Sequence, residues 1–135
     1  MEKTNEIKEA IQAATIVLEK LQEAHKHLKK AKNYGWLDVF RLDIFDIPKR
    51  LYMRQAEKCI NEAKTYIMHF EEELKDVDNL LQVDLSFFSL AAFSDFFWDG
   101  LYGNSQVLAQ ICDAYDNVGK AITQVEEIIQ KLKAL

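Results

Sequence analysis

Three separate stretches of the sequence repeat apolar residues at alternating intervals of three and four positions. Residues with this spacing lie above one another on one side of an α-helix, which has about 3.6 residues per turn. A long apolar stripe is unfavourable in water, so each helix must pack against a partner. The pattern therefore predicts an all-α antiparallel helical bundle with coiled-coil-like packing. The three stripes are Ile7, Ile11, Ala14, Leu18, Leu21, His25 and Leu28; Met53, Ala56, Ile60, Ala63, Ile67, Phe70, Leu74, Val77 and Leu81; and Leu108, Ile111, Tyr115, Val118, Ile122, Val125, Ile129 and Leu132.

Composition narrows the class of protein further. With 135 residues, 49% hydrophobic and 29% charged, the chain is expected to form one soluble domain, residues 1–135. A net charge of −5 argues against nucleic acid and anionic membrane surfaces as partners. No run approaches the roughly 20 apolar residues of a membrane span, and the charged N-terminus does not resemble a signal peptide. A cytoplasmic location is expected, with Cys59 and Cys112 as free thiols.

Turn and capping signals suggest where the first two helices begin and end. The first helix is expected to run from Thr4 to about Lys32 and to stop at Asn33 and Gly35. Residues 36–47 mix large apolar and charged side chains, which favours a loop with a short helix that caps one end of the bundle. The second helix is expected over residues 48–80, with Pro48 in its first turn.

The second half of the chain contains an aromatic-rich stretch that starts at Asp84 or Ser86 and runs to Trp98, and it is expected to form a shorter fourth helix buried on more than one side. The last helix is expected to begin at Asn104 or Ser105 and to continue to about Lys133. One continuous helix from Phe87 to Leu132 is an alternative, because the last stripe extends backwards in register. A break near residues 100–104 is favoured, since Gly100 and Gly103 interrupt the pattern.

Metal and cofactor sites are not expected from the motifs. Di-iron bundles use Glu-x-x-His pairs, and none of the three histidines has a glutamate three residues before it. Glu23 and His27 are four residues apart but lie beside the first stripe. His25 occupies a position on the stripe, where it would act either as a pH-sensitive group or, as we favour, through a local hydrogen bond.

The aromatic stretch also offers the best candidate for a ligand pocket. Asp95 and Asp99 lie one helical turn apart among aromatic side chains, and carboxylates in such surroundings require partners or a raised pKa. A structural role for these acids, such as accepting hydrogen bonds, is the favoured alternative. The basic side chains that open the second helix would pair with nearby aspartates, remain solvated, or bind an anion. The residues of this candidate interaction surface or pocket are Trp36, Asp38, Arg54, Asp95, Phe97, Trp98, Asp99 and Tyr102.

Two short motifs resemble a family of uncharacterised small helical proteins, mostly from Gram-positive bacteria. They are Trp36-Leu37-Asp38 after the first helix and the run from Phe93 to Leu101, with Phe70-Glu71-Glu72-Glu73-Leu74 between them. The sequence departs from the family pattern at Leu37 and at Ser94, where alanine is usual. The resemblance implies a helical fold and a bacterial origin, but it transfers no catalytic residue.

Function is expected to reside in binding and not in catalysis. No Ser/His/Asp set, Cys/His pair or glycine-rich phosphate loop stands out in the sequence. The leading hypothesis is a non-enzymatic interaction protein that self-associates, for example as a homodimer, or binds a partner helix. The alternative is a small-molecule-binding protein with an aromatic and acidic pocket near Trp98.

Overall fold

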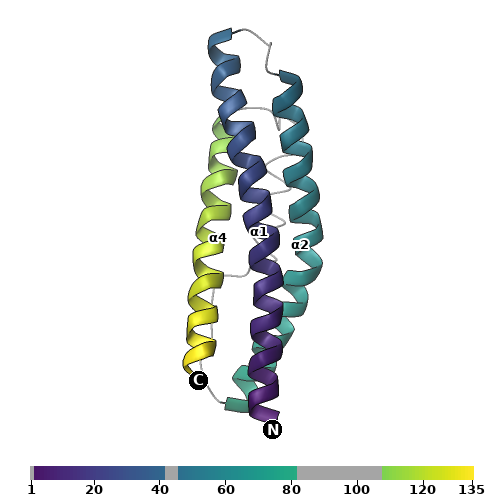
Figure 1. The fold of residues 1–135 in the computed structure, drawn as a ribbon, viewed down its shortest axis with the longest axis vertical. Helices are drawn as coiled ribbons and strands as arrows, with labels where there is room; N and C mark the ends of the chain where they lie inside the picture. The colour runs from purple at the N-terminus through teal and green to yellow at the C-terminus, as the bar shows by residue number, and fades with distance from the viewer. Residues whose placement is uncertain (1, 42–45, 82–107) are drawn as a thin grey trace.

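The computed structural model describes residues 2–41, 46–81 and 108–135. Across these ranges the protein is all-helical, with three helices and no strand (Figure 1): α1 is Glu2–Arg41, α2 is Asp46–Leu81 and α4 is Leu108–Ala134. At the usual rise of 1.5 Å per residue, α1 is about 60 Å long and α4 about 40 Å. The predicted all-α fold class is confirmed. The predicted aromatic-rich helix and the alternative of a continuous helix fall on residues 82–107, outside the described ranges.

The long helix α1 lies between α2 and α4 and runs antiparallel to both (Figure 1). It packs against each of them along its length, whereas no Cα of α2 lies within 8 Å of a Cα of α4. Because α2 and α4 are both antiparallel to α1, they are parallel to each other. The described part of the bundle is therefore centred on α1, and its three helices do not all contact one another.

The predicted stripes form the interior of the bundle. On α2, every stripe member whose side chain is described is buried, from Met53 to Val77, and Phe70 is completely inaccessible. On α4, Tyr115 and Ile122 are partly buried and pack against a core that contains the stripe members Ile111, Val118, Val125, Ile129 and Leu132. The three- and four-residue spacing thus identified the inward face of these two helices.

The first helix buries a wider face than the spacing predicted. Of the predicted stripe, Ala14, Leu21 and Leu28 are buried and the other members are partly buried. Five further small residues of α1 are also buried, because this helix faces two neighbours instead of one. Small side chains let helix axes approach closely, which explains why these positions carry alanine and valine. Lys20 Nζ, near the middle of α1, donates to Glu62 Oε2 of α2 at 2.9 Å across this interface. The five additional buried residues are Ala10, Ala13, Val17, Ala24 and Ala31.

The predicted end of the first helix is wrong. The helix passes through Asn33 and Gly35 and ends at Arg41, so most of the expected capping segment is a continuation of α1 and the first residues of α2. A glycine within a helix costs only about 1 kcal/mol, which tertiary contacts outweigh. One such contact is the stack of Tyr34 on Tyr52 of α2, with ring centroids 5.6 Å apart.

The other predicted boundaries lie closer to those observed. α1 begins at Glu2, so Thr4 lies within its first turn and is not the N-cap. α2 begins at Asp46, and Pro48 occupies the first turn, where a backbone N–H has no helical partner to lose. Within the described ranges, no helix combines the length and the apolar character needed to cross a membrane.

Candidate functional site

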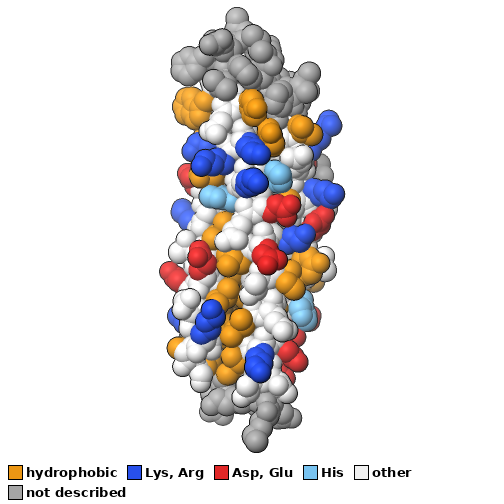
Figure 2. All heavy atoms as spheres, viewed as in Figure 1, with side chains coloured by type: hydrophobic (Ala, Val, Ile, Leu, Met, Phe, Trp, Pro, Cys, Tyr) orange, Lys and Arg blue, Asp and Glu red, His pale blue; other side chains and the backbone are white. Residues whose placement is uncertain are grey.

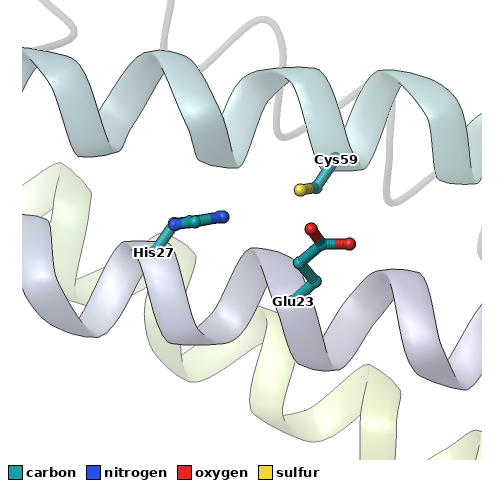
Figure 3. A group of neighbouring side chains, drawn as sticks. All are labelled: Glu23, His27 and Cys59. Carbon is teal, nitrogen blue, oxygen red and sulfur yellow. The ribbon is translucent and has the colours of Figure 1, made fainter.

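Three side chains with metal-ligating atoms converge at the interface of α1 and α2. Glu23 and His27 lie one turn apart on α1, and Cys59 faces them from α2 (Figure 3). A carboxylate oxygen, an imidazole nitrogen and the Cys59 sulfur all lie within 4.8 Å of one another. In Figure 3 the ring of His27 extends toward Cys59, and the carboxylate of Glu23 points at the same space. We call these three residues the Glu-His-Cys cluster.

The cluster lies at the edge of the core because of the position of each residue on its helix. Ala24 and Leu28, which directly follow Glu23 and His27, are fully buried in the core. A rotation of about 100° per residue places their predecessors at the rim of the interface, so Glu23 is exposed and His27 is half-buried. Cys59 belongs to the inward face of α2 and is only 6% exposed. The cluster therefore has a buried sulfur on one side and an exposed carboxylate on the other.

Tyr52 of α2 holds this part of the interface together. Its ring stacks on the ring of His27, with centroids 6.4 Å apart, and on that of Tyr34. The ammonium of Lys30 lies 5.1 Å from the centroid of the same tyrosine ring. Residues 27, 30 and 34 are three and four apart, so one face of α1 encloses Tyr52. These contacts fix the orientation of the His27 ring, whose Nδ1 is buried and has no hydrogen-bond partner.

Burial controls the charges of the cluster. Burial lowers the pKa of His27, and the negative charge of Glu23 opposes that shift only in part. Burial raises the pKa of the Cys59 thiol, and the carboxylates of Glu23 and Glu62 raise it further. At neutral pH the cluster therefore contains a neutral imidazole, which has a free lone pair, and a protonated thiol.

The interface of α1 with α4 contains a second histidine contact. The ring of His25 stacks on Tyr115 with centroids 4.0 Å apart, and Lys32 Nζ lies 4.8 Å from the centroid of the same tyrosine. Burial, followed by the charge of Lys29, lowers the pKa of His25, while Asp116 opposes the shift. His25 therefore makes a contact between helices, where the sequence analysis favoured a local hydrogen bond.

A group of carboxylates lies where the start of α1 meets the end of α2. Oxygens of Glu6, Glu73 and Asp76 lie within 4.8 Å of one another. Burial, followed by the charge of Glu9, raises the pKa of Glu73. His69 Nε2 lies 3.7 Å from Glu73 Oε1, a distance at which a protonated imidazole would attract the carboxylate. This arrangement of like charges destabilises the fold locally when all three acids are ionised.

The structure describes only part of the predicted pocket. Trp36 is half-exposed near the end of α1, Asp38 follows it on the same helix, and Arg54 is exposed on α2. The remaining predicted residues lie outside the described ranges, so the pocket stays a prediction. They are Asp95, Phe97, Trp98, Asp99 and Tyr102.

A surface hollow of about 360 Å³ lies at the opposite end of the bundle, between the start of α1 and the end of α4. It is far along α1 from Trp36, and apolar and lysine side chains form its walls. It shares no residue with the predicted pocket. The lining residues are Thr4, Ile7, Lys8, Ile11, Leu132, Lys133 and Leu135.

Sequence reasoning found two members of the Glu-His-Cys cluster but did not assemble it. The four-residue spacing of Glu23 and His27 is visible in the sequence, but the register that places Cys59 opposite them is a property of the packed helices. Figure 2 shows that charged and apolar side chains alternate over the visible face of the bundle, so side-chain type does not single out one site on that face. No protein family, curated protein or solved structure matches the chain in the comparisons made.

Proposed function

We propose that the chain is a cytoplasmic, non-enzymatic helical-bundle protein that acts by association, with a second copy of itself as the partner. The observation that carries the proposal is the exposure of two large apolar side chains at one end of the bundle. Trp36 of α1 is 49% exposed and Leu51 of α2 is 51% exposed. Isolated exposed apolar residues are common, but two at one level of adjacent helices favour a contact surface.

The stack of Tyr34 on Tyr52 places these two residues at the same level. Trp36 is two residues beyond Tyr34 on α1, and Leu51 is one residue before Tyr52 on α2. Because the helices are antiparallel, both steps lead in the same direction along the bundle, toward the connection between α1 and α2. Arg54, three residues from Leu51, lies on the same side of α2 and is also exposed. Tryptophan and arginine are enriched among residues that dominate binding energy at protein interfaces.

The arrangement of α1, α2 and α4 supports the predicted fourth helix. In an up-down-up-down four-helix bundle, the two parallel helices occupy diagonal positions and contact both remaining helices but not each other. α2 and α4 are parallel, each contacts α1, and they do not contact each other. We therefore propose that residues 86–98 supply the fourth helix, antiparallel to α2 and α4. In that arrangement the fourth helix completes the core, and the second copy associates with the surface that contains Trp36.

Light scattering coupled to size-exclusion chromatography tests the proposal with the full-length protein over a micromolar concentration series. We expect a concentration-dependent rise in mass toward that of a dimer. The variant Leu51→Ser should weaken self-association at least about tenfold, because the change removes apolar area from both copies of a symmetric interface. Met68→Ser is the matched control, since Met68 is 53% exposed on the same helix but lies more than four turns from Leu51.

Two results would contradict the proposal. A mass that stays monomeric throughout the series would exclude a second copy as the partner. Equal weakening by Leu51→Ser and Met68→Ser would show that association does not use the end that contains Trp36. Circular dichroism of both variants confirms that each retains its helical content.

A further inference from the structure

We infer that Glu23, His27 and Cys59 form a binding site for a divalent transition-metal ion, with Zn²⁺ as the best match. The inference is independent of the proposed self-association, because Leu51 and Trp36 are not among the three donor residues and Cys59 lies about two helical turns from Leu51. It rests on three observations: the identity of the donor atoms, their convergence, and the fixed orientation of the histidine ring.

The donor set selects the metal. Thiolate sulfur and imidazole nitrogen favour Zn²⁺ and its neighbours in the first transition series, whereas Mg²⁺ and Ca²⁺ prefer oxygen ligands alone. Cysteine sulfur, histidine nitrogen and carboxylate oxygen are all common zinc ligands. The filled d shell of Zn²⁺ imposes no coordination geometry of its own. Binding would release the thiol proton of Cys59 to solvent, since the thiolate is the ligand.

The distances are compatible with one ion. In a tetrahedral zinc site, ligand atoms lie about 3.3–3.6 Å apart, given metal–ligand bonds of about 2.0–2.3 Å. The three donor atoms are already within 4.8 Å of one another, so an approach of about 1 Å, chiefly by rotation of the Glu23 side chain, closes the site. The exposed Glu23 has the freedom to make this adjustment, and α1 and α2 need not move apart.

The surroundings favour binding in two further ways. Tyr52 stacks on His27 and restricts its ring, so little side-chain entropy remains to be lost on binding. The Cys59 sulfur lies in the core, where the thiol is shielded, while Glu23 is open to solvent and provides a path of entry. Three protein ligands would leave a fourth position of the ion for water, as in zinc sites that are open to small molecules.

Cobalt titration tests the site, using full-length protein first treated with a chelator and then dialysed. Co²⁺ replaces Zn²⁺ in such sites and reports a thiolate ligand through a sulfur-to-metal charge-transfer band in the near ultraviolet. We expect this band to saturate at one ion per chain and to disappear when Zn²⁺ is added. Cys59→Ser should abolish the band, and Cys112→Ser, which changes the cysteine of α4, should retain it.

Two more variants separate a ligand from a residue that only supports the fold. Glu23→Gln changes an exposed side chain and should weaken Zn²⁺ binding at least about tenfold without altering the helical content. His27→Gln should weaken it similarly, whereas His69→Gln, at an exposed histidine of α2, should have no effect. In the unchanged protein, Zn²⁺ at about a hundredfold excess over its Kd should raise Tm by several degrees.

Three results would overturn the inference. The first is the absence of a charge-transfer band in the unchanged protein. The second is a band that survives Cys59→Ser but is lost in Cys112→Ser. The third is an unaltered Zn²⁺ affinity in Glu23→Gln and His27→Gln, which would place the ion elsewhere.

Discussion

The imidazole of His25 lies almost parallel to the phenol ring of Tyr115, at an angle of 11° and with ring centroids 4.0 Å apart. This contact joins α1 to α4 through two flat surfaces instead of interlocking aliphatic side chains. Gly119 lies one turn beyond Tyr115 on the same helix, and a Cβ at that position would lie 3.3 Å from His25 Nε2. The small residue at 119 therefore leaves room for the stacked histidine.

Gly119→Ala should stabilise the protein less than a glycine-to-alanine substitution inside a helix normally does. Replacing such a glycine by alanine stabilises a helix by about 1 kcal/mol, but here the new methyl group crowds the His25 ring. In a His25→Ala background the crowding is absent, so the full gain should return. Chemical denaturation of the two single variants and the double variant measures this difference. Strictly additive free energies would show that the ring and the methyl group do not interact.

Phe70→Ala should destabilise the protein by about 3–5 kcal/mol, because it removes the largest fully buried side chain of the described core. Met68→Ala on the same helix should cost far less, since that side chain is 53% exposed. Urea denaturation monitored by circular dichroism measures both. A near-neutral Phe70→Ala would mean that α2 is turned differently from the arrangement described. The same loss expected for Phe97→Ala stays a prediction, because Phe97 lies outside the described residues.

Periodicity predicted the inward face of α2 and α4 but only part of the buried face of α1, and local signals did not predict where α1 ends. Ile60 and Val118 are buried, as expected from their positions in the apolar stripes. The helical repeat that defines a stripe can be recognised from the sequence alone. Asn33 and Gly35 are weak stop signals that can be outweighed by contacts with another helix, such as the stack on Tyr52. Those contacts depend on the register between helices, and no single stretch of sequence encodes that register.

The same reason explains why the candidate metal site was not predicted. A pair such as Glu23 and His27 is recognisable from its spacing, whereas a ligand from another helix is recognisable only after packing. The buried alanines of α1 were missed for a different reason. Alanine is both a strong helix former and a small core residue, so Ala24 and Ala31 carry no distinctive apolar signal in the sequence.

Glu73→Gln should stabilise the protein at neutral pH and lose that effect on acidification. Burial and the charges of Glu9, Asp76 and Glu6 raise the pKa of Glu73 in the folded state, while His69 opposes them. The folded state therefore binds a proton more tightly than the unfolded state does. The unfolding free energy contributed by Glu73 falls as pH rises from about 4.5 through the folded pKa. The variant carries no such penalty, so its advantage should grow with pH across that window.

Denaturation midpoints from pH 4 to pH 8 measure the difference between Glu73→Gln and the unchanged protein. Glu72→Gln is the matched control, because Glu72 is the adjacent residue of α2 and is exposed. Its effect should be small, because Glu72 is exposed. An advantage of Glu73→Gln that stayed constant with pH would assign the effect to packing and not to charge.

Cys112 should react with iodoacetamide at least about tenfold faster than Cys59 when a chelator is present. Cys59 is buried and burial raises the pKa of its thiol, so both access and thiolate content are reduced. Reaction of Cys59 then requires local opening of the α1–α2 interface, which costs free energy. The partly exposed Cys112 does not require this opening. Peptide mass spectrometry over a time course gives the two rates. Faster labelling of Cys59 would contradict its position in the core.

The alanines of α1 give this helix an unusual sensitivity to added bulk. Ala10, Ala14, Ala24 and Ala31 are completely inaccessible, and α1 alone separates α2 from α4 among the helices described. A larger side chain at one of these positions would clash with α2 or α4. The small side chains of α1 thus set the distance between α2 and α4. Adding even one methyl group at such a position would displace a neighbouring helix, because the interior is closely packed.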